Sequence, residues 1–213
     1  MELKKNNGLI LREVDCWQGR ADIVEGFSND IYTSINTFSD EQILLIRNLT
    51  CAKIISLLNH TTARTKKLIY NNLGIQKKTI DVWLVRLLEE EILAETRPDR
   101  FIIHPNFSLP EIKFTAYEVK LYNWKRALYQ ATQYKGFSNK SYVVMPKKHI
   151  QPAINNLQAF VANNIGLIEV NDDGRFKILL KSRNLRPTSK AFNIIGKGIA
   201  LYQLKNSRQM NHF

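Results

Sequence analysis

The sequence predicts an α/β protein whose mixed sheet, flanked by helices, is interrupted by a helical block. Residues 9–24 and 114–145 contain stretches with the two-residue alternation of strands, whereas residues 39–105 carry apolar side chains at helical spacing. We therefore expect the strands to meet in one sheet around an inserted domain. The expected domains are residues 1–36 and 108–213, the two parts of the sheet core, and residues 37–107, the insertion.

The first element is a predicted hairpin. Leu9–Cys16 forms one strand, Trp17–Gly19 the turn and Arg20–Val24 the second strand. Asp22 lies in the middle of the second strand, where aspartate is disfavoured, so its position calls for a reason. Its carboxylate either faces solvent or binds a metal ion together with Glu118.

A loop-like stretch, residues 26–39, leads into the helical block. Ser39-Asp40-Glu41 begins a helix, and Gly74 ends a later one. The remaining elements follow at short intervals: helices around Ile54–Leu58, at Thr65–Leu73 and at Lys77–Glu91, then a hairpin of Ile92–Glu95 with Phe101–His104.

Residues 73–105 are similar to the winged helix-turn-helix pattern. Thr65–Leu73 would be the positioning helix and Lys77–Glu91 the recognition helix, whose N-terminal part faces the DNA groove. The resemblance implies DNA contacts at the start of the recognition helix and phosphate contacts at the wing tip. The implied residues are Gln76, Lys77, Lys78 and Thr79, with Asp81 beside them, and Arg97 and Arg100 on the wing. A winged helix is also a common protein–protein module, and that alternative stays open.

The stretch Phe114–Tyr134 combines a strand with a helix. Glu118 and Lys120 alternate onto the same face as Phe114, so a carboxylate and an ammonium lie together where the face begins apolar. Burying such a pair is costly unless it is hydrogen-bonded or coordinates an ion. Asn123 can cap the helix, on which Gln130 and Tyr134 share a face, and Ser141–Met145 is a buried strand.

The C-terminal part is predicted to add helices and one hairpin. Apolar residues predict a helix over 154–161 and another over 191–204, and residues 166–170 and 176–181 form a hairpin around a plain turn at 171–174. Basic residues gather nearby, where they either contact a DNA backbone or form a solvated loop: Lys181, Arg183, Arg186 and Lys190.

Three motifs together resemble the PD-(D/E)XK nuclease superfamily, which has the restriction-endonuclease-like fold. They are Glu118-Val119-Lys120, Gln130-x-x-x-Tyr134 on the next helix and the upstream Gly19-Arg20-Ala21-Asp22, as in the RecB-like branch. Pro98-Asp99 matches the letters of the superfamily's name, but it lies in the wing turn, where both residue types are common. Asp22 is therefore the predicted partner of Glu118. An ordinary strand with a surface salt bridge is the alternative.

The resemblance implies a metal-dependent DNA endonuclease. Asp22, Glu118 and the Val119 carbonyl would hold Mg²⁺ or Mn²⁺, which favour hard oxygen ligands. Lys120 would orient or deprotonate the attacking water, and Gln130 and Tyr134 would support it.

One departure from the family pattern favours an alternative function. Many members carry a further acidic residue on a helix before the first core strand, but only 8 residues precede Leu9 here. Glu2 and Glu13 are weak substitutes. The alternative is a catalytically inactive, nuclease-fold regulator that binds DNA.

Composition restricts the partners. Among the 213 residues, Lys and Arg exceed Asp and Glu by 12, which suits a polyanion, with nucleic acid first and an anionic membrane second. No run of eighteen apolar residues and no signal peptide is recognisable. The two cysteines, Cys16 and Cys51, match no metal spacing and favour a reduced, cytoplasmic protein. We expect DNA and no membrane as partner, and a homodimer is left open.

Overall fold

The structure is a computed structural model that describes residues 8–15, 19–29, 31 and 35–210. Three residues discussed above lie outside the described ranges: Glu2, Cys16 and Trp17, at which the first turn is expected. The chain divides into two compact units: Met1–Asn29 with Ile112–Ser189, and Asp30–Glu111 with Lys190–Phe213.

The first unit contains a mixed six-stranded sheet of order β1-β2-β6-β7-β8-β9. The β6, β7 and β8 strands run parallel, and the neighbouring pairs on either side are antiparallel. The expectation that the four strands on both sides of the helical block meet in one sheet is confirmed. The strands are β1 (Gly8–Asp15), β2 (Arg20–Phe27), β6 (Lys113–Val119), β7 (Lys140–Pro146), β8 (Gly166–Val170) and β9 (Phe176–Leu180).

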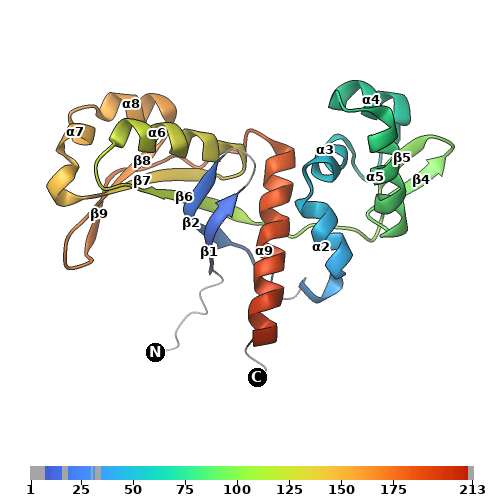
Figure 1. The fold of residues 1–213 in the computed structure, drawn as a ribbon, viewed down its shortest axis with the longest axis horizontal. Helices are drawn as coiled ribbons and strands as arrows, with labels where there is room; N and C mark the ends of the chain where they lie inside the picture. The colour runs from blue at the N-terminus through green and yellow to red at the C-terminus, as the bar shows by residue number, and fades with distance from the viewer. Residues whose placement is uncertain (1–7, 16–18, 30, 32–34, 211–213) are drawn as a thin grey trace. The chain divides into compact units, whose positions relative to one another are not determined.

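Helices cover one face of this sheet. α6 (Trp124–Gln133) packs on β6 and β7 with its buried Ala127, Leu128 and Ala131 (Figure 1). Asn123 caps it by accepting a hydrogen bond from the Arg126 N–H, as expected for this residue type. Tyr134 follows in a short 3-10 turn, η2 (Tyr134–Gly136).

The helix expected over residues 154–161 is instead two short ones, α7 (Gln151–Ile154) and α8 (Leu157–Asn163). Asn155 and Asn156 lie between them, and asparagine side chains compete with helical backbone bonding. The Asn156 amide donates to the Pro152 carbonyl, which ends the first helix.

The second unit combines helices with a three-stranded sheet of order β3-β5-β4. The predicted helix start at Ser39 is confirmed. The Ser39 hydroxyl accepts a hydrogen bond from the Gln42 N–H, and the Gln42 side chain accepts one from the Ser39 N–H. Thr65 caps α4, and Gly74 ends it at φ 62°, in the left-handed region that glycine favours. The elements are η1 (Ile35–Thr37), α2 (Asp40–Arg47), α3 (Leu49–Leu57), β3 (Arg64–Thr65), α4 (Lys66–Leu73), α5 (Lys77–Glu89), β4 (Leu93–Arg97), β5 (Arg100–Ile103) and α9 (Lys190–Met210).

The C-terminal helix α9 groups with the helical unit, whereas the sequence placed residues 190–213 with the sheet core. It packs against α2 and α3 and buries Ile195 and Leu201. Gly198 permits this close approach, since a Cβ there would lie 2.8 Å from the Ile46 side chain. Long-range packing, which an apolar pattern alone does not reveal, therefore decides which unit the helix joins.

Candidate active site

The register of β2 and β6 places Asp22 beside Glu118. Val24 pairs with Ala116 and Ile23 with Tyr117, so the next step of the antiparallel ladder brings Asp22 opposite Glu118. Residues opposite each other in such a pair project from the same face. The Asp22 Oδ2 atom accepts a hydrogen bond from the Val119 N–H at 2.8 Å. Asp22 and Glu118, which are distant in the sequence, therefore lie on the same face of neighbouring strands, near the end of β6.

The Glu118 carboxylate is fully buried, with an exposed fraction of 0%. The Tyr134 hydroxyl donates to its Oε2 atom, and the Lys120 Nζ lies 2.7 Å from its Oε1 atom. The angles between Lys120 Nζ and Oε1 are not those of a hydrogen bond, so the contact is an ion pair only. Among the described residues Oε1 therefore has no hydrogen-bond partner. A buried carboxylate needs a compensating positive charge. For Glu118 this is the Lys120 ammonium, whose side chain is 31% exposed.

Tyr134 fixes the position of the Glu118 carboxylate. Its hydroxyl lies 2.9 Å from the Arg20 carbonyl oxygen as well, so it connects η2, β2 and β6. Burial, and then the hydrogen bond to Glu118, raise the pKa of the Tyr134 hydroxyl. This group therefore remains a protonated donor at neutral pH.

Gly19 has a structural reason in the Gly19-x-x-Asp22 motif. Its φ is +119°, in a region that other residues rarely adopt, and a Cβ would lie 3.5 Å from the Tyr134 ring. The positive φ is what favours glycine here, because a Cβ at 3.5 Å would make only an ordinary van der Waals contact with the ring.

Gln130 lies one helical turn before Tyr134. Its Oε1 atom is buried, and in the described part of the chain it accepts no hydrogen bond. Its predicted support of Lys120 stays a prediction. Glu13, considered as a weak acidic substitute, forms an exposed ion pair with Arg20 at 2.6 Å.

Two of the side chains here carry the oxygen donors that hard divalent cations prefer. Asp22 and Glu118 supply carboxylate oxygens, and Glu118 Oε1 is a buried acceptor that lacks a hydrogen bond within the described residues. No cluster of three or more His, Cys, Asp or Glu that could hold a metal occurs among the residues described. An ion here would therefore need backbone oxygen and water as further ligands, as Mg²⁺ commonly does.

The predicted DNA-contact residues in the second unit are all exposed. One group lies at the N-terminal end of α5, and the other flanks the turn between β4 and β5, where Arg97 and Arg100 are register partners. These exposed side chains are Gln76, Lys77, Lys78, Thr79, Arg97 and Arg100.

Asp81, expected beside this group, instead makes contacts within the unit. Its carboxylate accepts a hydrogen bond from the Tyr70 hydroxyl and lies 2.9 Å from Lys66 Nζ. The Tyr70 hydrogen bond, followed by the Lys66 hydrogen bond, lowers the pKa of Asp81. Lys66 also lies 3.9 Å from Asp99 in the turn between β4 and β5. Asp81 therefore joins α4 to α5, which the sequence pattern did not indicate.

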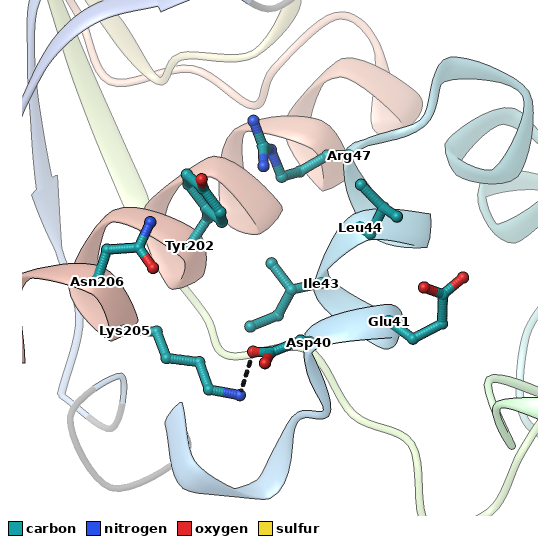
Figure 2. A pocket seen from close by; sticks show the side chains of 8 residues that line it. All are labelled: Asp40, Glu41, Ile43, Leu44, Arg47, Tyr202, Lys205 and Asn206. Carbon is teal, nitrogen blue, oxygen red and sulfur yellow. Dashed lines mark ion pairs between the residues drawn. The ribbon is translucent and has the colours of Figure 1, made fainter. Parts of the chain in front are cut away.

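A hollow of about 310 Å³ lies between α2 and α9 (Figure 2). Its charged groups contact neighbouring side chains: Lys205 pairs with Asp40 at 2.7 Å, and the Arg47 guanidinium lies 4.1 Å from the Tyr202 ring centre. None of the predicted site residues lines it. We interpret it as a helix-packing seam.

The fold and site define an α/β protein with two carboxylates and a lysine at the end of a parallel strand. Comparison with protein-family models, curated proteins and solved structures finds no match. Of the helices described, none combines the length and apolar character that a membrane crossing requires.

Proposed function

We propose that this protein is a metal-dependent DNA endonuclease of the PD-(D/E)XK type, with an inserted winged helix-turn-helix domain that binds DNA. The observation that carries the proposal is that Asp22 accepts the hydrogen bond of the Val119 N–H, directly beside buried Glu118, and that Lys120 pairs with the Glu118 carboxylate. These groups come from segments that the helical unit separates in the chain. Coincidental surface salt bridges do not explain a fully buried glutamate.

The site residues divide the work of phosphodiester hydrolysis. Asp22, Glu118 and the Val119 carbonyl would hold Mg²⁺ or Mn²⁺, which when bound stabilises charge on the phosphate. The Lys120 ammonium lies 2.7 Å from the buried carboxylate on a side chain that is 31% exposed, so it can orient water or stabilise developing negative charge. Tyr134 keeps Glu118 aimed at the strand end.

The winged-helix part of the proposal is supported by the order of elements in the second unit. Helix α3 is followed by β3, α4, α5, β4 and β5, and the three strands pair in the order β3-β5-β4. The exposed basic side chains at the start of α5 and on the β4–β5 turn suit phosphate contacts. A cytoplasmic location and a homodimer stay predictions.

A catalytically inactive regulator is the second candidate. Both Glu118 oxygens already contact protein groups, Tyr134 and Lys120, so a metal must compete with the Lys120 ammonium. In an inactive regulator, the Glu118–Lys120 ion pair would take the place of a metal ion, and only DNA binding by the winged helix would remain.

A cleavage screen with full-length protein separates the two candidates. Supercoiled plasmid and structured DNA are incubated with Mg²⁺, Mn²⁺ or Ca²⁺, with and without chelator. The endonuclease should cleave with Mg²⁺ or Mn²⁺, stop with chelator and show little activity with Ca²⁺, whose loose geometry aligns water poorly. Absence of cleavage together with absence of Mn²⁺ binding would establish the inactive reading.

A further inference from the structure

A basic edge with an exposed aromatic ring adjoins the candidate active site. We define it as Lys120–Tyr122, which follow β6, and Lys147–His149, which follow β7. Because β6 and β7 are parallel neighbours, their carboxyl ends lie at the same edge of the sheet. The Tyr122 and His149 rings contact each other, with centroids 4.3 Å apart, which shows that both segments meet.

Two large apolar or aromatic side chains and two lysines of the basic edge are exposed. Tyr122 is 65% exposed and Leu121 is 58% exposed, immediately beyond Lys120. Lys147 and Lys148 are exposed as well. An accessible ring amid ammonium groups presents two chemistries to a ligand: a stacking face and positive charge.

Acidic groups mark the far limit of this edge. Asp172 lies 3.8 Å from Lys148, and Asp173 is engaged by Arg175. Together with Lys147 and Asn171 they line a hollow of about 650 Å³. These carboxylates repel phosphate, so a polyanion must approach from the Tyr122 side.

We propose that the basic edge binds unpaired DNA, with one base stacked on Tyr122 and the adjacent phosphates held by Lys147 and Lys148. Unpaired bases stack on exposed aromatic rings, whereas bases within a duplex are already stacked. The His149 ring packs against the Tyr122 ring at a tilt of 50°. A protein partner fits less well, because lysine is depleted from protein interfaces.

This proposal rests on the proposed nuclease function and makes it more specific. The unpaired base would lie next to the phosphate that Lys120 reaches, since Tyr122 follows two residues later. The substrate would then be DNA with a single-stranded segment beside the cleaved bond, rather than fully paired duplex.

Binding of full-length protein to two matched DNAs tests the proposal. One is a blunt duplex, and the other carries a single-stranded tail containing 2-aminopurine, whose fluorescence falls when it stacks. Chelator is present, so cleavage plays no part. Tyr122→Ala should weaken binding of the tailed DNA on the order of tenfold and abolish the quenching, with blunt-duplex affinity unchanged. Tyr122→Phe retains the ring and should bind as wild type does.

Tyr129→Ala is the matched control, because Tyr129 is an exposed tyrosine, 67% exposed, on α6. It should leave both affinities unchanged. The proposal is overturned if wild type binds tailed and blunt DNA with equal affinity. It is also overturned if the Tyr122 and Tyr129 variants lose equal affinity for tailed DNA. A Tyr122-dependent tail preference without cleavage in any metal would retain this surface and reject the nuclease function. Metal-dependent cleavage without a Tyr122-dependent preference for tailed DNA would retain the nuclease function and reject this surface.

Discussion

The Asp22 carboxylate accepts a hydrogen bond from the Val119 N–H, with 2.8 Å between nitrogen and oxygen, although 97 positions separate the two residues in the chain. This contact fixes the side chain of the second strand against the backbone that links Glu118 to Lys120. The Asp22 carboxylate thereby lies at the backbone of the residue that follows Glu118. A group placed by the backbone of its neighbouring strand is well suited to hold an ion in a defined position.

Lys120→Ala should abolish cleavage while leaving Mn²⁺ binding intact or slightly tighter, because an ammonium is not a metal ligand and no longer competes for the Glu118 Oε1 atom. The expected loss is on the order of 100-fold or more, as for other proton-transfer groups. Plasmid cleavage and calorimetric Mn²⁺ titration measure the two properties. Lys177→Ala, at an exposed lysine on β9, is the matched control. Equal residual rates in wild type and Lys120→Ala would place the chemistry elsewhere.

Asp22→Asn and Glu118→Gln should each abolish both cleavage and Mn²⁺ binding while the fold is preserved, because each keeps the side-chain size. DNA binding should be unchanged or slightly tighter, since less negative charge then faces the phosphates. Fluorescence anisotropy measures the binding. Asp172→Asn, at a carboxylate 89% exposed, is the control. Full activity in both site variants would show that these carboxylates hold no required ion.

Replacement of Lys77, Lys78, Arg97 and Arg100 by alanine should weaken DNA binding and flatten its salt dependence. Each lost phosphate contact removes a slope of roughly 0.9 in log affinity against log salt. Anisotropy titrations at several salt concentrations measure that slope. The comparison variant replaces Lys181, Arg183 and Arg186. If only that variant lowers the slope, the second unit is a protein-docking module.

Tyr134→Phe should lower the free energy of unfolding by about 1.5–3 kcal/mol, because buried Glu118 loses a hydrogen bond to a charged acceptor. Urea unfolding measures this change. Tyr117→Phe is the control, since the Tyr117 hydroxyl donates to Glu25 at the surface. Its loss should be smaller. Equal losses would mean that the Tyr134 hydroxyl contributes no more than an ordinary surface bond.

Asp81 predicts an acid-dependent stability of the second unit. Its folded pKa lies below the usual 3.8, so its contribution is present above about pH 4 and is lost as pH falls through the folded pKa. Asp81→Asn should therefore be less stable than wild type at pH 7, and the difference should shrink toward pH 3. Urea unfolding at both values measures it. A difference independent of pH would contradict the role of the charge.

The sequence by itself determined the local elements of this protein. Alternation in Phe114–Val119 specified a strand, and Ser39 and Asn123 specified helix starts, because each depends on neighbours within one turn or one pleat. The same periodicity put Glu118 and Lys120 on one face. Their assignment to a metal site remains a prediction, since it rests on motif resemblance.

Only the tertiary structure decided which distant segments meet. It placed α9 with the helical unit, paired Asp81 with Lys66 and set Gly19 against the Tyr134 ring. These outcomes depend on burial against partners far along the chain, and a pattern of apolar residues does not identify those partners. Local backbone preference acts over a few residues, whereas partner choice is settled by the whole packed core.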